Sequence, residues 1–194
     1  MSGSHQHSAQ NSATLILGGC RSGKSRFAEQ RARRYQRRLF IATMQAGDDP
    51  ELHQRIRHHQ ESRGNGWETE EEPLRLVEAI ENRAAATDII LVDCLTLWLS
   101  NCLLDDQSDD EIMQQVSSLS QAIQKLKTPL LLVANEVGLG LVPDSVLGRR
   151  FRDLAGWCNQ QVAGCCQEVV FMAAGLPLRL KGPETPTAYS DEPT

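Results

Sequence analysis

Residues 18–25 have the composition and spacing of a loop that binds phosphate groups. They fit the pattern G-x-x-x-x-G-K-S with Gly18, Gly19, Cys20, Arg21, Ser22, Gly23, Lys24 and Ser25. The glycines let backbone N–H groups approach phosphate oxygens, Lys24 can neutralise the β- and γ-phosphates, and the Ser25 hydroxyl can hold Mg²⁺. An apolar run precedes the loop and a run of helix formers follows it. This setting favours a nucleotide site over a glycine-rich turn that matches by accident.

A second candidate is Asp93, which follows the apolar residues 89–92. A carboxylate at the end of a strand beside a P-loop can hold Mg²⁺ through water. The alternative is that Asp93 caps the helix that begins near Leu95, and the two roles can coexist. We favour the metal or nucleotide role, because a P-loop needs such a partner.

A third candidate is a histidine between two arginines. Arg55, His59 and Arg63 are spaced i, i+4 and i+8, so they share one face if the helix expected over 48–62 persists. Arginines bind phosphate, and a neutral histidine can act as a base or a nucleophile. A solvated basic face explains the same spacing, and the spacing alone does not decide between the two. His58 faces another side and is the weaker candidate.

The elements that position these residues alternate between apolar strands and helices. The order favours an α/β, P-loop (RecA-like) three-layer fold: a mostly parallel sheet with helices on both faces, a short antiparallel edge strand at the C-terminus, and the ligand at the carboxyl ends of the strands. The glycine-containing loop 135–143 is expected at that end. Strands are expected at 13–17, 39–43, 88–93, 129–134, 168–173 and 176–181, and helices at 26–35, 48–62, 73–86, 108–126 and 145–166, with a capping box at Ser108.

Composition narrows the class of protein. With 194 residues, 40% apolar and 23% charged, the chain predicts one catalytic domain over 13–182, between disordered tails at 1–12 and 183–194. A net charge of −5 argues against a nucleic-acid partner, and no apolar run is long enough for a membrane span. Six cysteines without a C-x-x-C pair, and no secretory signal, predict reduced thiols in a cytoplasmic protein.

The chain as a whole resembles the bifunctional adenosylcobinamide kinase/adenosylcobinamide-phosphate guanylyltransferase family of cobalamin (vitamin B12) biosynthesis. A P-loop alone is common to many families, whereas an ordered set of motifs is specific. The set consists of GGCRSGKSR at 18–26, IAT at 41–43, RIRHH at 55–59 with Arg63, WETEEEP at 67–73, LVDCLTLW at 91–98 with Asn101, NEVGLG at 135–140, RRFRD at 149–153 with Gly156, Asn159 and Gln160, and GLPL at 175–178.

The resemblance implies two reactions. A nucleoside triphosphate, ATP or GTP, phosphorylates the aminopropanol hydroxyl of adenosylcobinamide, and GTP then transfers GMP to adenosylcobinamide phosphate, giving adenosylcobinamide-GDP and pyrophosphate. The family pattern R-I-x-x-H makes His59 the histidine that is transiently guanylylated. The family also forms homotrimers with sites between subunits.

The resemblance further implies nucleotide contacts, and three consecutive glutamates leave one of them open in register. Met44 stands where a small polar residue is expected, and any of Glu70, Glu71 and Glu72 could make the contact or form an acidic first turn of the next helix. Arg149, Arg152 and Asp153 are possible corrinoid contacts or helix-surface ion pairs. The implied contacts are Ala42, Thr43, Met44, Gln60, Glu61, Ser62, Arg63, Glu71 and Asp93.

Three other functions remain open. A generic P-loop small-molecule kinase would form no covalent nucleotide adduct. A family member could retain only guanylylation. A GTP-binding regulatory protein would not turn over adenosylcobinamide, and the set of Lys24, Ser25, Asp93 and His59 disfavours it.

Overall fold

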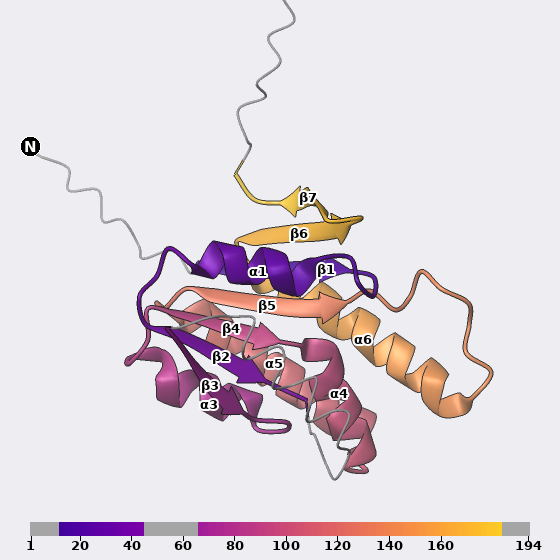
Figure 1. The fold of residues 1–194 in the computed structure, drawn as a ribbon. Coiled ribbons are helices and arrows are strands. Elements are labelled where there is room, and N and C mark those ends of the chain that lie inside the picture. Colours follow the sequence, from indigo (N-terminus) through magenta and orange to yellow (C-terminus); the bar gives the residue numbers. More distant parts are fainter. Residues whose placement is uncertain (1–11, 45–65, 184–194) are drawn as a thin grey trace, which may run out of the picture.

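A computed structural model describes residues 12–44 and 66–183 as one mostly parallel sheet flanked by helices (Figure 1). The predicted helix at 48–62, residues 1–11 and 184–194 of the predicted tails, and the candidates Arg55, His59 and 60–63 lie outside these residues. The elements are β1 (Ala13–Gly18), α1 (Lys24–Ala32), β2 (Arg38–Ala42), β3 (Trp67–Glu71), α3 (Leu76–Ala84), β4 (Ile89–Asp93), α4 (Leu95–Leu104), α5 (Asp109–Lys125), β5 (Leu130–Asn135), α6 (Val146–Cys165), β6 (Glu168–Ala173) and β7 (Leu176–Lys181).

The sheet has the strand order β3-β2-β4-β5-β1-β6-β7, and every pair is parallel except β6 with β7. Its register aligns the strand ends, because Ala42 lies opposite both Asp93 and Glu71, and Gly18 lies opposite Asn135. The carboxyl ends of five strands therefore meet at one edge, the edge at which open α/β sheets bind ligands.

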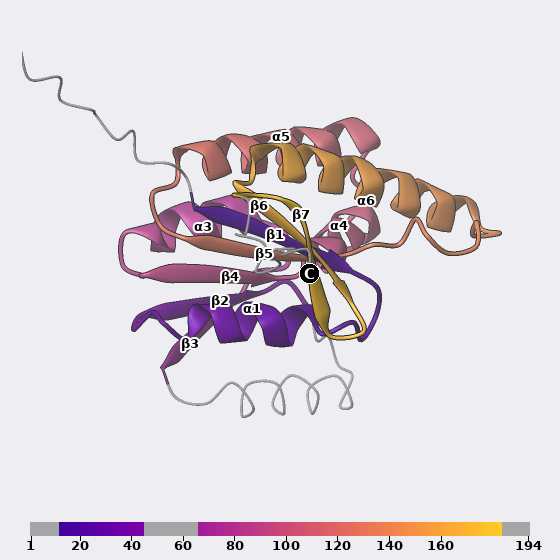
Figure 2. The ribbon, with the colours of Figure 1, turned by 90° about the horizontal axis from the view of Figure 1, so that it is seen from above.

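Helices cover both faces, in unequal number. Of the helices that the structure describes, α1 packs on one face and α3, α4, α5 and α6 on the other (Figures 1 and 2). Successive strand residues serve opposite faces, so that Leu15 and Leu17 contact the four-helix side and Ile16 the α1 side. Burial on both sides explains why the central strands read as continuous apolar runs. None of the described helices has the length and apolarity to cross a bilayer.

Several predicted boundaries are confirmed closely. Strands β6 and β7 have the predicted limits, and β7 is the antiparallel edge. Helix α5 begins after a capping box in which the Ser108 hydroxyl accepts the Glu111 N–H and the Glu111 carboxylate accepts the Ser108 N–H. Helix α6 begins after Ser145, whose hydroxyl accepts the Gly148 N–H at 3.0 Å.

The predicted helix at 73–86 is wrong at its start. Pro73 lies before α3 rather than in its first turn, because the Glu72 carboxylate accepts the N–H groups of Leu74 (3.0 Å) and Arg75 (2.8 Å). These bonds form a local turn that delays the helix until Leu76. The helix expected at 26–35 is shifted as well and spans α1 (Lys24–Ala32).

The edge strand β3 was not predicted from the sequence. Glu68 and Glu70 from this strand both pair with Arg83 of α3, the latter at 2.9 Å. The strand begins with Trp67, whose ring contacts Phe40 of β2 edge-on. In the sequence, the acidic residues around Thr69 obscure the alternating strand pattern that begins with Trp67. Charged side chains are typical of a sheet edge that is protected from pairing with another chain.

Candidate functional site

The P-loop connects β1 to α1 through backbone conformations that depend on glycine. Gly23 has φ +96°, in the left-handed region, and a Cβ there would lie 3.3 Å from Cα of Gly175. A Cβ on Gly18 would lie 2.4 Å from the Met172 carbonyl oxygen, which is closer than real Cβ contacts. Glycine at both positions lets the loop lie against the end of β6 and the turn into β7.

Backbone hydrogen bonds fix the loop in this position. The Gly175 N–H donates to the Ser22 carbonyl at 3.0 Å, and the Ser22 N–H donates to the Gly19 carbonyl at 3.3 Å. The Glu136 N–H, just after β5, donates to the Gly18 carbonyl at 3.0 Å. The loop is thus held from two sides, by β5 and by the β6–β7 turn. The P-loop motif did not predict this support by Gly175. Gly175 belongs to the GLPL motif at 175–178, which gave no indication of a contact with the P-loop.

The first turn of α1 has the features of an anion-binding helix N-terminus. Its N-cap, Gly23, offers no side-chain acceptor, and no acidic residue lies in that turn. Helix α5 differs, since it begins with the Ser108 cap followed by three acids. The N–H groups at the start of α1 therefore have no side-chain acceptor within their own helix, and the helix dipole favours negative charge there.

Lys24 is buried within this loop, with 7% of its surface exposed. Its Nζ donates to the Gly19 carbonyl at 2.6 Å and lies 3.5 Å from the Ser22 Oγ. Burial lowers the pKa of Lys24 below its ordinary 10.5, and the nearby Asp93 carboxylate opposes that shift. Both acceptors belong to the loop, so a phosphate oxygen bound at the loop could replace them as the hydrogen-bond acceptor of the Lys24 ammonium.

Ser25 and Asp93 supply the oxygen atoms that Mg²⁺ prefers, a hydroxyl and a carboxylate. Asp93 ends β4, is partly buried, and is close enough to Lys24 to affect its pKa. Within 12–44 and 66–183, no three His, Cys, Asp or Glu side chains cluster as a metal cage. A hydroxyl and one carboxylate fit an ion that keeps its waters and binds substrate phosphates, so the metal role stays a prediction with a suitable donor set.

A hydrogen-bond network ties the ends of β2 and β4 together. The buried Thr43 hydroxyl accepts the Cys94 N–H (2.8 Å) and donates to the Cys94 carbonyl (2.7 Å). The Asn101 amide from α4 donates to the carbonyls of Thr43 (2.6 Å) and Pro73 (3.1 Å). This network fixes the point at which the chain leaves β2 and enters residues 45–65, which include His59.

The structure separates the three consecutive glutamates. Glu70 pairs with Arg83, and Glu72 accepts two N–H groups in the turn before α3. Glu71 is exposed at the carboxyl end of β3, opposite Ala42, and has no hydrogen-bond or ion-pair partner among the described residues. Glu70 and Glu72 are thus engaged within the fold, and a nucleotide contact of Glu71 stays a prediction.

The other predicted contacts divide into those that the structure describes and those that lie outside the described residues. Ala42 and Thr43 are buried at the ligand edge, and Met44 follows them, half-buried. Cys20 and Arg21 are exposed on the P-loop, with Arg21 in the left-handed region at φ +54°. Residues Gln60, Glu61, Ser62, Arg63 and His59 lie outside the described residues, and their contacts remain predictions.

The possible corrinoid contacts lie on α6. The Arg149 guanidinium donates to the carbonyls of Pro143 (3.0 Å) and Asp144 (2.6 Å), so it closes the loop before the helix. Arg152 lies 3.5 Å from Asp153, in an exposed pair. Neither arrangement points to a ligand, and both fit the alternative of helix-surface contacts.

The lowered pKa of Lys24 predicts the pH dependence of nucleotide binding. As the pH rises through this pKa, the ammonium is lost, and affinity for a triphosphate falls before the ordinary 10.5 is reached. Asp93→Asn removes the carboxylate that raises the pKa of Lys24, so it should shift the loss to lower pH. The measurement is the Kd of a non-hydrolysable GTP analogue from neutral to alkaline pH, in EDTA to exclude metal. Asp88→Asn, which removes the partner of Arg37 before β4, is the control. Identical profiles for Asp93→Asn and wild type would contradict the assignment.

The Asn101 network predicts a loss of stability. Asn101→Ala leaves the Thr43 and Pro73 carbonyls without this donor, which should lower the free energy of unfolding by about 1–3 kcal/mol. Leu104→Ala, at an exposed position of the same helix, should change it by less than about 0.5 kcal/mol. Denaturant titration of both variants is the measurement, and equal effects would show that the network contributes nothing.

Comparison with known proteins gives concordant results. The family model for cobinamide kinase / cobinamide phosphate guanyltransferase matches residues 14–180. The bifunctional adenosylcobalamin biosynthesis protein CobP of Pseudomonas aeruginosa is 46% identical over 169 residues, which cover 87% of this chain and 96% of the relative. CobU of Escherichia coli, which has the same description, is 38% identical over 179 residues, covering 86% and 98%.

Solved structures agree on the fold. A Pyrococcus horikoshii protein aligns with a TM-score of 0.56 at 9% identity, covering 90% of this chain and 88% of the other. A prototypical ATPase from a bacterial type III secretion system aligns with a TM-score of 0.51 at 11% identity, covering 88% and 57%. These similarities support the fold alone. The family model and the relatives, which span nearly the whole described sheet, show that the chain belongs to the cobinamide kinase/cobinamide phosphate guanyltransferase family.

Proposed function

We propose that this chain catalyses two successive reactions in the nucleotide-loop assembly stage of cobalamin biosynthesis. It phosphorylates adenosylcobinamide with ATP or GTP, and it transfers GMP from GTP to adenosylcobinamide phosphate, giving adenosylcobinamide-GDP and pyrophosphate. Membership of the family, and relatives described as bifunctional, support both activities. We place the reactions in the cytoplasm, as the sequence predicts.

The observation that carries the proposal is the buried Lys24 ammonium at the start of an α-helix without a side-chain cap. Backbone amides, a lysine and the carboxylate of Asp93 converge at one edge of the sheet, as a triphosphate site requires. In the kinase reaction, Lys24 and the amides of the loop hold the β- and γ-phosphates of the donor. The substrate hydroxyl attacks the γ-phosphorus, and the nucleoside diphosphate leaves.

In the second reaction, the proposed nucleophile is His59. An imidazole nitrogen forms a bond to the α-phosphorus of GTP while the bond to the bridging oxygen of the β-phosphate breaks, and pyrophosphate leaves. A phosphate oxygen of the corrinoid substrate then attacks the same phosphorus and releases the imidazole. Lys24 and the α1 amides stabilise the leaving pyrophosphate. Mg²⁺, when bound through Ser25 and Asp93, supplies neutralisation of phosphate charge.

Labelling with GTP that carries ³²P at the α-phosphate tests this mechanism. Wild type should acquire an acid-labile label, and His59→Ala should acquire none and lose guanylyl transfer about a thousandfold or more. His58→Ala, at the adjacent histidine, is the matched control and should keep the label. Undiminished labelling of His59→Ala would refute the assignment.

Product analysis separates the alternative functions. The proposed enzyme yields both adenosylcobinamide phosphate and adenosylcobinamide-GDP. A generic kinase stops at the phosphate and forms no adduct, a guanylyltransferase requires the phosphate to be added, and a regulatory protein forms neither product.

We also propose that the chain forms a homotrimer with active sites between subunits. A closed ring of three needs two different surfaces that meet head to tail. Among the described residues, exposed apolar side chains gather at two places: the loop before α6 together with the first turn of that helix, which we call the loop surface, and strand β7. The loop surface comprises Leu139, Leu141, Val142, Val146 and Leu147, and β7 exposes Leu176, Leu178 and Leu180. Exposed apolar side chains in such groups commonly mark interfaces.

Sedimentation velocity tests the trimer. Wild type should sediment as a species whose mass is three times the 21.5 kDa of one chain. Leu141→Asp and Leu178→Asp should each dissociate it, because every interface uses both surfaces and would bury a charge. Leu104→Asp, at a leucine 71% exposed outside both surfaces, should leave the trimer intact. A monomeric wild type, or a trimer in all three variants, would contradict the proposal.

A further inference from the structure

Strand β5 lies between the two strands that carry the residues proposed to bind phosphate. Its neighbours are β1, which leads into the P-loop, and β4, which ends at Asp93. The last residue of β5 is Asn135, which lies opposite Gly18 at the start of the P-loop. Asp93 lies opposite Val133, so β5 extends two residues beyond the end of β4. Asn135 is therefore the residue of β5 that stands between the P-loop and Asp93.

The alternation of side chains along the strands assigns Asn135 to the face of the sheet that α1 covers. Val133 of β5 packs on that face, and Asn135 follows it by two positions. Asp93 follows Leu91 of β4 onto the same face in the same way. Lys24 is the first residue of α1 itself. An ammonium, a carboxylate and an amide thus share one face of the sheet at its carboxyl edge.

The backbone of Asn135 is held in place by two helices. Its N–H donates to the hydroxyl of Thr96 at 2.7 Å, and its carbonyl accepts the side-chain amide of Asn159 at 3.3 Å. Thr96 lies in the first turn of α4, directly after β4, and Asn159 lies on α6. Both partners are buried. The position of Asn135 is therefore fixed without any use of its own side chain.

The side-chain amide of Asn135 has no hydrogen bond to any of the described residues, in contrast to its polar neighbours. The amides of Asn101 and Asn159 donate to backbone carbonyls, and the Glu136 carboxylate accepts the Gly138 N–H at 2.7 Å. Asn135 is half-buried, and no side-chain nitrogen or oxygen of the described residues is buried without a partner. The amide atoms of Asn135 are therefore accessible to a ligand.

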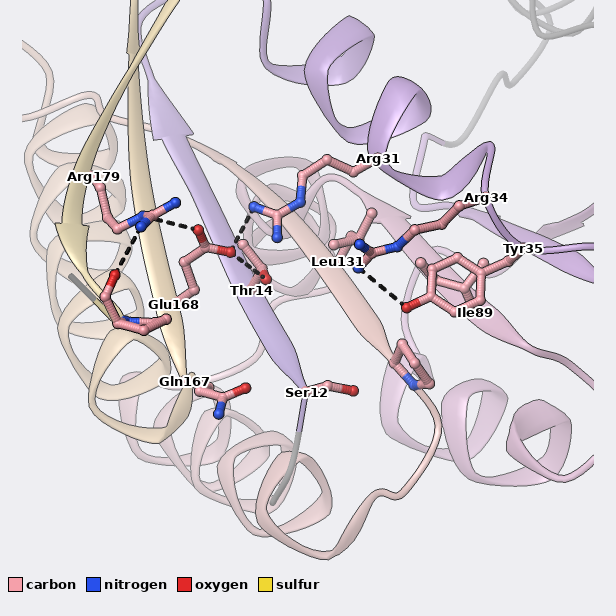
Figure 3. Close-up of a pocket in the computed structure, with 12 residues that line it drawn as sticks. Ser12, Thr14, Arg31, Arg34, Tyr35, Ile89, Leu131, Gln167, Glu168 and Arg179 are labelled. Carbon is pink, nitrogen blue, oxygen red and sulfur yellow. Dashed lines mark hydrogen bonds and ion pairs between the residues drawn. The ribbon is translucent and has the colours of Figure 1, made fainter. Parts of the chain in front are cut away.

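The opposite edge of the sheet shows polar side chains whose positions the fold itself explains (Figure 3). Glu168 there accepts the Thr14 hydroxyl at 3.2 Å. The same carboxylate pairs with Arg31 and Arg179. These side chains bind one another, whereas the amide of Asn135 has no such partner within the described chain.

We propose that the side-chain NH₂ group of Asn135 donates a hydrogen bond to an oxygen of the γ-phosphate of the bound nucleotide. This inference rests on the nucleotide site of the proposed function, in which Lys24 and the loop amides hold the β- and γ-phosphates. An amide donates a hydrogen bond to the phosphate without adding charge beside Asp93. In the kinase reaction the γ-phosphoryl group is the one transferred, so this donor stabilises charge on its equatorial oxygens.

The affinities for a triphosphate and a diphosphate test this contact without the corrinoid substrate. The full chain is titrated with a non-hydrolysable GTP analogue and with GDP, at one Mg²⁺ concentration. Asn135→Ala should weaken the analogue about tenfold, as expected for a lost hydrogen bond to a charged group, and should leave GDP within about twofold of wild type. Asn82→Ala, the same substitution at an exposed position of α3, is the matched control and should change neither Kd.

An isosteric variant separates a contact with the nucleotide from a packing role. Asn135→Asp keeps the shape of the side chain but replaces the donor with a charged acceptor. It should weaken the GTP analogue at least as much as Asn135→Ala does, because the carboxylate and the phosphate repel each other. A packing role would leave this variant with the affinity of wild type.

The two reactions should respond differently to Asn135→Ala. The kcat for phosphorylation of adenosylcobinamide should fall about tenfold to a hundredfold, because the lost donor touches the transferred group. The amount of label acquired from GTP that carries ³²P at the α-phosphate should match wild type at saturating GTP, because the γ-phosphate is then part of the leaving pyrophosphate.

Four results would overturn the proposal. These are equal weakening of both nucleotides in Asn135→Ala, unchanged affinity of that variant for the analogue, wild-type affinity in Asn135→Asp, and an unchanged kcat for phosphorylation. Equal weakening would show that Asn135 supports the loop and does not touch the γ-phosphate. A wild type that binds both nucleotides but converts no corrinoid would instead refute the proposed function, and the two affinities would still decide the role of Asn135.

Discussion

The buried ammonium of Lys24 is the interaction on which the rest of the site depends. Removing a cation from water is costly unless partners compensate for the lost hydration. Here the Gly19 carbonyl, the Ser22 hydroxyl and the charge of Asp93 provide that compensation. The sheet brings Asp93 toward the loop through β5, which pairs in parallel with β4 on one side and with β1, the strand before the loop, on the other. The position of the Lys24 charge therefore links the register of the sheet to the binding of phosphate.

The central part of the fold could be predicted because its elements are strongly patterned. Continuous apolar runs indicated the buried strands, and the Ser108 capping box marked the start of α5. The edge strand β3 was missed because its side chains are largely acidic and half-exposed, which is the pattern of a loop as much as of a sheet edge. The late start of α3 was missed because the carboxylate of Glu72 turns toward its own following N–H groups.

The same division holds for the site. Lys24, Ser25 and Asp93 follow from motifs in which spacing and chemistry agree. The different environments of the three glutamates could be described only with the pairing of β3 and β2, in which Glu71 lies opposite Ala42, a contact between strands that no local pattern encodes.

The support of the P-loop by Gly175 also bears on how the protein is made. The loop is among the first described residues to be synthesised, yet its Ser22 carbonyl is bonded by a residue near the end of the described chain. Strand β1 likewise has β6 as one of its two neighbours. A nascent chain that has not yet released the β6–β7 hairpin from the ribosome therefore lacks a complete nucleotide site, and nucleotide cannot assist folding until that hairpin has emerged.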